Sequence, residues 1–300
     1  MHCFISDGLR FEYTSRGLGA TPFFFQHGIG GTQAQPLRFW DSFDSKRSGA
    51  AAPQALFQQL RLLTFDFRAH GRSPVGDPEK LRLDVFADDL VSLMNYLRVE
   101  NAVLGGISMG AAVALNAALR YRERCVALVL VRPAWLNGSM CPTAIAAYKE
   151  AINCLQQEPS PLCALEKLER SEIYRVIIRQ SADAGRSLLG QLRCVVSDPS
   201  LRTAVLARLH HLPSDQPDDD LQRATEINVP TLVLATPGDP IHPLSYAQEI
   251  AAAIPGCTYI QLAPKQLDDG PHVQEVGEYI LQFLKGLASG SNLTGSDLFH

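Results

Sequence analysis

The feature that most constrains the fold is the pentapeptide Gly106-Ile107-Ser108-Met109-Gly110, which lies between an apolar run and an alanine-rich run. Residues 101–107 have the apolar and β-branched content of a buried parallel strand, and residues 111–120 carry Ala, Leu and Val at helical spacing. The chain must therefore turn sharply at Ser108. Because Gly106 and Gly110 have no side chains, strand and helix can approach closely, and the serine hydroxyl is lifted out of a strained turn. The pattern predicts a nucleophilic serine, and a serine that only caps the helix is the alternative.

Strand-like runs alternate with helical patterns along most of the chain. Strands are expected at residues 9–14, 22–26, 60–66, 101–107, 126–131, 231–236 and 258–262, and helices at 84–98, 109–120, 244–253 and 273–287. This alternation is typical of an α/β fold, in which a mostly parallel central sheet carries helices on both faces.

Residues 135–221 interrupt the alternation, because strand signals vanish there and apolar residues recur at helical spacing. We therefore expect a core formed by residues 1–134 and 222–287, an inserted helical cap at 135–221 and a flexible tail at 288–300. The arginines of the insertion, Arg208 among them, are expected on solvated helix faces, although one of them could bind a substrate carboxylate.

Composition excludes several classes of function. A chain of 300 residues with 46% hydrophobic content can bury a large core. The net charge of −4, without a block of Lys or Arg, gives no footprint for nucleic acid. No stretch reaches the length of a membrane span and no signal-peptide core forms before Gly8, so a cytoplasmic protein is expected. The seven cysteines include no C-x-x-C pair, which argues against a zinc site or a disulfide framework.

A serine nucleophile needs a base to take its proton and an acid to orient that base. Asp239 lies in the turn 237–240 after the run 231–236, and His272 follows the last strand-like run. Asp268 and Asp269 are rival acids on the histidine's own loop and are interpreted as solvated. His242, three residues after Asp239, is interpreted as a surface residue or as one that supports the site from behind.

The order Ser108, Asp239, His272 resembles that of the α/β-hydrolase fold family. Residues 27–31 (HGIGG) look like the family's oxyanion loop, and residues 65–73 look like its turn after the next strand. The resemblance implies an oxyanion hole formed by the backbone N–H groups of Ile29 and Met109. Gly28 and Trp135 are the candidate substrate contacts. The chain departs from the family at Pro271, where glycine is common.

The resemblance implies a serine hydrolase that cleaves a small carboxylic ester or lactone through an acyl-enzyme, without metal or cofactor. Because the cap reads as mostly apolar, the expected partner is a small-molecule substrate with an apolar part. Three alternatives stay open: acyl transfer or perhydrolysis, cleavage of an amide, thioester or C–C bond by the same three residues, and non-catalytic ligand binding. The oligomeric state stays open too.

Overall fold

The apolar runs pair into one sheet in the computed structural model, which describes residues 2–42, 59–218, 220–265 and 268–289. Within these residues the sheet has eight strands in the order β1-β2-β4-β3-β5-β6-β7-β8. The strands are β1 (His2–Ser6), β2 (Leu9–Arg16), β3 (Thr21–Gln26), β4 (Leu60–Phe65), β5 (Ala102–Ile107), β6 (Cys125–Val131), β7 (Thr231–Ala235) and β8 (Thr258–Gln261). From β4 to β8 every pairing is parallel, whereas β1 and β2 add an antiparallel edge. The predicted α/β class is confirmed.

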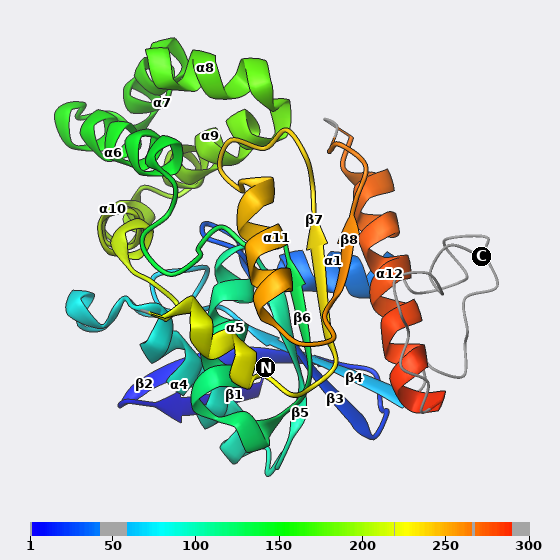
Figure 1. The fold of residues 1–300 in the computed structure, drawn as a ribbon. Helices are drawn as coiled ribbons and strands as arrows, with labels where there is room; N and C mark the ends of the chain where they lie inside the picture. The colour runs from blue at the N-terminus through cyan, green and yellow to red at the C-terminus, as the bar shows by residue number, and fades with distance from the viewer. Residues whose placement is uncertain (1, 43–58, 219, 266–267, 290–300) are drawn as a thin grey trace.

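Helices cover both faces of the sheet, and β3 shows why (Figure 1). Phe23 and Phe25 point to the face covered by α1 (Ala34–Ser42) and α12 (Gly270–Ser289), where they join a cluster with Phe39. Phe24 points the other way, into the larger cluster that includes Phe86. That cluster packs under α4 (Leu83–Tyr96), α5 (Met109–Arg120) and α11 (Leu244–Ala253). The side-chain alternation of a strand thus supplies two cores from one apolar run.

Two elements were not predicted from the sequence. The first is strand β1, which pairs with β2 through a turn at Asp7 and Gly8, where φ is 48° and 74°. Two successive residues with positive φ are typical of a tight hairpin turn. The second is helix α1, which contains Pro36 in its first turn. Proline usually argues against a helix, but in the first turn it removes no intrahelical hydrogen bond, so the helix can form.

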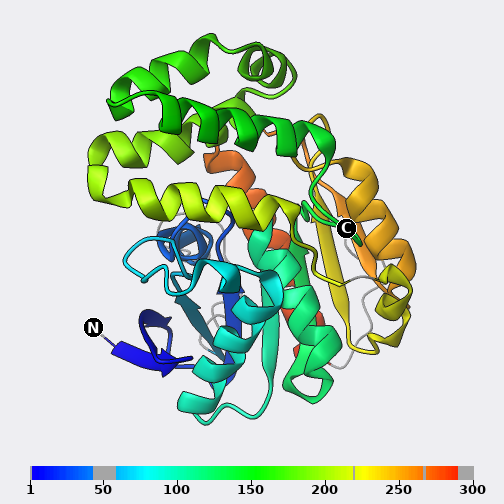
Figure 2. The same cartoon turned by 90° about the vertical axis from the view of Figure 1, so that its left-hand side faces the viewer.

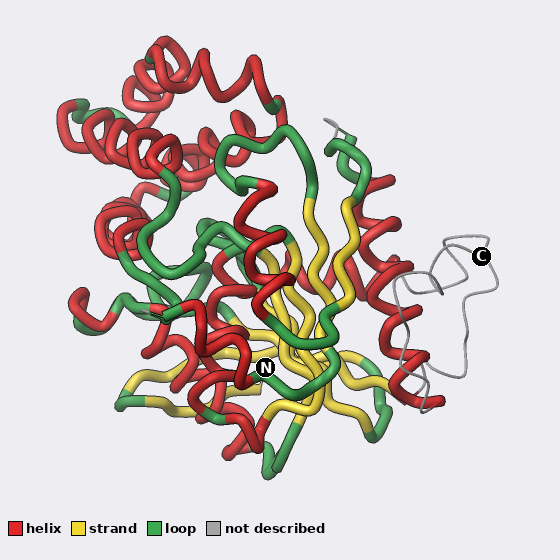
Figure 3. Tube along the Cα trace, in the orientation of Figure 1, coloured by secondary structure: helices red, strands yellow, loops and turns green. Residues whose placement is uncertain are grey.

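Between β6 and β7 the chain makes a helical insertion, as predicted, and it lies above the carboxyl ends of the strands (Figures 1 and 2). Figure 3 shows that this layer consists of helices and loops. Its α-helices are α6 (Pro142–Gln157), α7 (Pro161–Arg170), α8 (Glu172–Gln180), α9 (Ala182–Ser197) and α10 (Arg202–His211). The two ends of the insertion meet, because Met140 N–H donates to the Pro213 carbonyl at 2.9 Å. The expected domain division at 135–221 stays a prediction.

Short 3-10 helices complete the described elements. They are η1 (Pro78–Lys80), η2 (Arg122–Arg124), η3 (Pro199–Leu201), η4 (Leu212–Ser214) and η5 (Leu221–Glu226). Helix α12 continues to Ser289, past the predicted start of the tail at 288, and residues 290–300 of the predicted tail lie outside the described residues. In the part of the chain that is described, no helix is both long and apolar enough to cross a membrane.

A buried ion pair ties α4 to the segment that follows β4. Arg68 donates through Nε and Nη2 to the two carboxylate oxygens of Asp89, at 2.7 and 2.8 Å. The Arg68 side chain is 1% exposed and that of Asp89 is fully buried. Asp7 accepts a further hydrogen bond from Arg68 at 3.0 Å. The two-pronged geometry compensates the charges that burial would otherwise leave without water.

Candidate active site

The turn between β5 and α5 holds Ser108 in a conformation that side chains rarely adopt. Its φ is 55° and its ψ is −107°. The flanking glycines are required, since a Cβ at Gly106 would meet the backbone of Gly110, and a Cβ at Gly110 would meet the backbone of β3 at Gln26 and His27. The Ser108 N–H donates to the Val131 carbonyl at 2.9 Å, which fixes the turn against β6. The predicted sharp turn is therefore present, and its strain is held by neighbouring backbone.

Ser108 and Asp239 are joined through His242. Nε2 of His242 lies 2.9 Å from Oγ of Ser108, and its Nδ1 lies 2.9 Å from Oδ2 of Asp239. These distances match a hydrogen-bonded chain in which the serine donates to Nε2 while Nδ1–H donates to the carboxylate, a tautomer that we assign from the partners. Ser108 and Asp239 are 5% and 9% exposed, so these hydrogen bonds are largely shielded from water. Such an arrangement can remove the serine proton.

A tight turn after β7 brings His242 to this place. Oδ1 of Asp239 accepts hydrogen bonds from the N–H groups of Ile241 and His242, at 2.9 and 3.2 Å. Gly238, with φ of 75°, lets the chain leave the strand. Oδ1 of Asp239 thus holds the turn that follows it. This turn directs the imidazole of His242, three residues later, back to Oδ2 of the same carboxylate. The interpretation of His242 as a surface residue is therefore corrected.

His272 does not hold the position expected for the base. It lies in the first turn of α12 and is 7% exposed, and among the described residues the structure shows no hydrogen bond from it to Ser108 or Asp239. Its buried Nδ1 has no partner within that part of the chain. Burial, with the nearby charges of Arg132 and Lys265, lowers the pKa of His272 to about 4, so its ring is neutral at pH 7.

A buried cluster of charges surrounds Asp239. Arg132, at the end of β6, forms ion pairs with Asp239 and with Asp183 of α9. Lys265, after β8, binds the other oxygen of Asp183 at 2.7 Å. Burial opposes ionisation of Asp239, but His242 and Arg132 outweigh it and hold the pKa of this carboxyl well below its usual range. Asp239 is therefore ionised at neutral pH. Asp183 ties the insertion to the strand ends.

Arg132 also lies close to the imidazole of His242. Its Nη2 lies 3.3 Å from Nδ1 of His242, the atom that faces Asp239. Since Nδ1–H is assigned as the donor to Asp239, this approach is a contact between two donors and not a hydrogen bond. Arg132 and His242 thus share one carboxylate.

The loop after β3 passes directly beside the nucleophile. A Cβ at Gly28 would lie 3.3 Å from that of Ser108, and the Gly28 N–H is held by Oε1 of Gln35 at 2.8 Å. Met109 is the first residue of α5, and the N–H of such a residue has no acceptor within its own helix. Both segments thus have the placement that an oxyanion hole needs. The roles of Ile29 and Met109 as donors, and of Gly28 as a substrate contact, stay predictions.

Comparison with known proteins agrees with this architecture. The family model described as alpha/beta hydrolase fold matches residues 21–151. The crystal structure of the enol-lactonase from Burkholderia xenovorans LB400 superposes with a TM-score of 0.69, covering 95% of this chain and 100% of that chain, at 19% identity. The chain has the α/β-hydrolase fold, and its residues 21–151 are similar to members of that family. The proteins that it resembles include proteins named as a lactonase, an esterase and a carbamate hydrolase.

Other α/β hydrolases are similar over most of their length. A hydrolase from Pseudomonas aeruginosa PA01 is 26% identical, with a TM-score of 0.67 over 94% of this chain and 97% of that chain. A RutD protein of Caulobacter sp. (strain K31), named as a candidate carbamate hydrolase, is 28% identical over 228 residues, which are 70% of this chain and 75% of the relative. The names of these relatives span lactone and carbamate cleavage.

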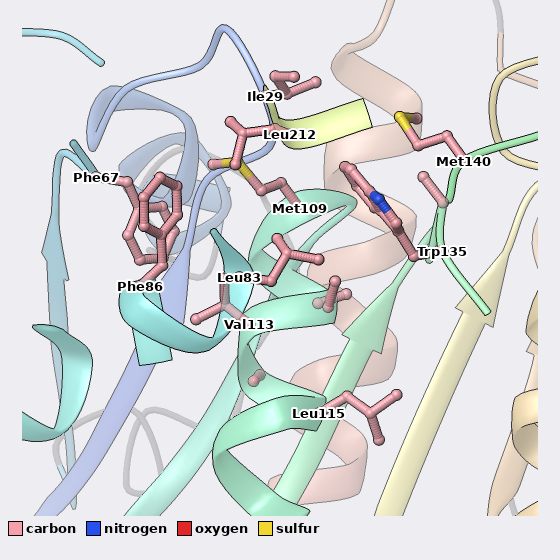
Figure 4. Close-up of a cluster of buried hydrophobic side chains, with 14 of the residues drawn as sticks. Ile29, Phe67, Leu83, Phe86, Met109, Val113, Leu115, Trp135, Met140 and Leu212 are labelled. Atoms are coloured by element: carbon pink, nitrogen blue, oxygen red, sulfur yellow. The ribbon is translucent and has the colours of Figure 1, made fainter. Parts of the chain in front are cut away.

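Apolar side chains gather around the start of α5 (Figure 4). Ile29 and Leu212 lie beside Met109, and Met140 lies beside Trp135. Trp135 is 1% exposed, and its buried indole N–H has no partner among the described residues. The side chains come from the loop after β3, from the start of the insertion and from its end. They give the surroundings of the serine an apolar character, as expected from the composition of the insertion.

Two buried histidines of the loops have structural partners. Nδ1 of His27 donates to the Gly28 carbonyl at 2.9 Å, while its Nε2 accepts from the N–H of Phe67 at 3.1 Å. His70 donates through Nδ1 to the Arg68 carbonyl at 2.8 Å. Burial lowers the pKa of His27 to about 4 and that of His70 well below its usual value. Both rings are therefore neutral, and their hydrogen bonds hold the loop backbone.

One arginine of the insertion is not on a solvated face. Arg208 of α10 is 4% exposed and reaches the Ala69 carbonyl at 3.0 Å. The expectation of solvated arginines is wrong for this residue, because it lies on the same helix face as buried Leu212, four positions on. The described part of the chain contains no group of three His, Cys, Asp or Glu side chains placed to hold a metal ion.

Proposed function

We propose that this α/β hydrolase cleaves a small carboxylic ester or lactone through an acyl-enzyme on Ser108. The observation that carries the proposal is the hydrogen-bonded chain Ser108–His242–Asp239, with both links at 2.9 Å, on a strained turn. We assign His242 as the base in place of the predicted His272, and Asp239 as the acid. This assignment follows the geometry, because a base must lie within hydrogen-bond reach of the proton that it abstracts.

The proposed reaction has two halves. Ser108 Oγ attacks the substrate carbonyl and its proton passes to Nε2 of His242, while Asp239 stabilises the imidazolium. The C–O bond to the leaving alcohol then breaks, and the alcohol takes that proton. Water next gives a proton to His242 and attacks the acyl carbon, which releases the acid and restores the serine. In a lactone the alcohol stays attached to the acyl group.

The substrate class rests on what surrounds the serine. Apolar side chains from the insertion, including Trp135 and Met140, support an acyl or alcohol part that is apolar. A lactone or ester fits the acyl-enzyme route without any cofactor. The test panel also includes carbamates, because relatives carry that name.

A fluorophosphonate probe tests both the nucleophile and the base. We expect one adduct per chain in intact mass, absent from Ser108→Ala. His242→Ala should slow labelling by about 10²-fold or more, the usual contribution of a general base, whereas His272→Ala is its matched histidine control and should label at a similar rate to the wild type. If His272→Ala loses labelling and His242→Ala keeps it, the base is His272. An unlabelled, folded wild type would overturn the proposed function.

A further inference from the structure

A side chain of the insertion binds the loop after β3, which is predicted to supply one of the two oxyanion-hole donors, the N–H of Ile29. Nε2 of Gln191, on α9, donates to the Ile29 carbonyl at 3.2 Å. The same side chain fills the space beside Gly30, where a Cβ would lie 2.6 Å from the Gln191 Cδ. Gly30 has a φ of 76°, so the loop adopts a shape that a side chain would both strain and block. Loop and Gln191 therefore fit together as one unit.

Arg208 holds Gln191 in turn. Nη2 of Arg208 donates to Oε1 of Gln191 at 3.0 Å, and Nη1 donates to the Ala69 carbonyl at 3.0 Å. The Gln191 amide can then present only its N–H side to Ile29, because its oxygen is occupied by the guanidinium. A continuous line of hydrogen bonds runs from Arg208 through Gln191 to the peptide that follows Ile29.

The charge of Arg208 has no counter-ion within the described residues, where no carboxylate forms an ion pair with it. Its partners are a backbone carbonyl, an amide and the thiol of Cys194 at 3.7 Å, and Nε has no partner there. Burial lowers the pKa of this guanidinium, yet an arginine stays protonated. A buried, uncompensated cation is unfavourable for folding alone. Because Arg208 lies close to the loop that is predicted to hold the oxyanion, its positive charge can stabilise the negative charge that forms there during the reaction.

We propose that Gln191 and Arg208 are positioning residues that complete the oxyanion hole from the insertion. Gln191 fixes the peptide between Ile29 and Gly30, which adjoins the predicted Ile29 N–H donor. The Arg208 charge, transmitted through the amide in a site that excludes water, favours the tetrahedral oxyanion over the flat carbonyl. This inference rests on the proposed function. According to this inference, the insertion contributes to stabilising the transition state and does not only cover the substrate.

The test compares variants in the maximal rate of fluorophosphonate labelling and in the probe concentration that gives half of it. Gln191→Leu and Arg208→Gln should each lower the maximal rate about tenfold or more while the half-saturating concentration changes little, because the hole acts on the transition state. The double variant should lose little beyond the worse single one, since the two act in series. Arg208→Lys, which keeps the charge, should recover part of the rate.

A second probe and a matched control separate positioning from folding. Phenylboronic acid, which forms a tetrahedral adduct with a reactive serine, should bind more weakly to both variants by a factor similar to the loss of rate. Arg193→Gln removes an arginine of α9 that is 51% exposed, and it should match the wild type in every measurement. Circular dichroism establishes which variants are folded.

The outcomes are distinct. Folded Gln191→Leu and Arg208→Gln proteins that label at the wild-type maximal rate would overturn the inference and leave the proposed function standing. The inference also fails if the half-saturating concentration alone changes, because the two residues would then bind the probe's ground state. A folded wild type that never labels at Ser108 would overturn the proposed function and this inference together.

Discussion

Replacing Gly110 by alanine tests whether the turn at the nucleophile depends on close backbone contact. A Cβ at this position would lie 2.9 Å from the His27 carbonyl oxygen and closer still to that of Gln26, whereas ordinary van der Waals contact begins at 3.4 Å. Both oxygens belong to backbone at the end of β3, which pairs with β4 and β5 on its two sides and cannot rotate away as a flexible side chain could. The helix or the strand must therefore move.

The magnitude follows from two opposing effects. Alanine is favoured over glycine in a helix by about 1 kcal/mol, and less so in the first turn. Overpacking typically costs about 1–3 kcal/mol, and the upper end applies here because the blocking atoms are backbone. The net loss for Gly110→Ala is about 2 kcal/mol, which lowers the melting temperature by roughly 4–8 °C in a protein of this size class. Labelling of Ser108 should slow as well, since Gly110 lies two residues from it.

The same substitution elsewhere supplies the control. Gly190 lies within α9, and a Cβ there would meet nothing within 4 Å. Gly190→Ala should raise the free energy of unfolding by up to about 1 kcal/mol. Calorimetry on the two variants and the wild type gives the comparison. If Gly110→Ala melts at or above the wild-type temperature, close approach of α5 and β3 does not explain the glycine.

Two further predictions concern buried charge. Asp89→Ala leaves the guanidinium of Arg68 with only Asp7, so it should destabilise the fold by about 3 kcal/mol, whereas Asp7→Ala, at a side chain that is 41% exposed, should destabilise it clearly less; equal losses in thermal melting would contradict this. The pKa of His272 is about 4 in the folded protein and 6.5 in the unfolded chain. As the pH falls from 6.5 to 4, the unfolded chain therefore binds a proton that the folded chain does not, and the free energy of unfolding decreases by up to about 3 kcal/mol. Denaturation curves at pH 7 and pH 4.5 should show a smaller decrease for His272→Gln than for the wild type, and equal decreases would contradict the assignment of a neutral buried ring.

The sequence predicted the turn at Ser108 and the sheet because their signals are local. A strand, a G-x-S-x-G turn and a helix are contiguous, and their geometry follows from steric limits within one short segment. Asp239 was found in the same way, as a carboxylate in a turn after a strand. The antiparallel β1 was harder to recognise, since only Phe4 and Ser6 among its five residues are buried.

The partner of Ser108 could not be read from chain order. His242 and His272 both follow Asp239, and the choice between them depends on which imidazole the backbone aims at the serine. The signal that was available is the spacing Asp-x-x-His directly after a Gly-containing turn, which lets one carboxylate oxygen hold the turn while the other holds the ring. Arg208 was misjudged for a related reason, because the burial of a helix face in an insertion depends on what it packs against.

The hydrogen bond between Met140 and Pro213 makes the insertion a segment that could be exchanged as a unit. The two ends of the insertion meet at this bond, so residues 141–212 form a closed segment whose length is not limited by the spacing of β6 and β7. An exchanged segment could alter which molecules are accepted while the strands keep their register. In this protein such an exchange would also remove Gln191, so a transplanted segment has to supply its own support for the Gly30 loop.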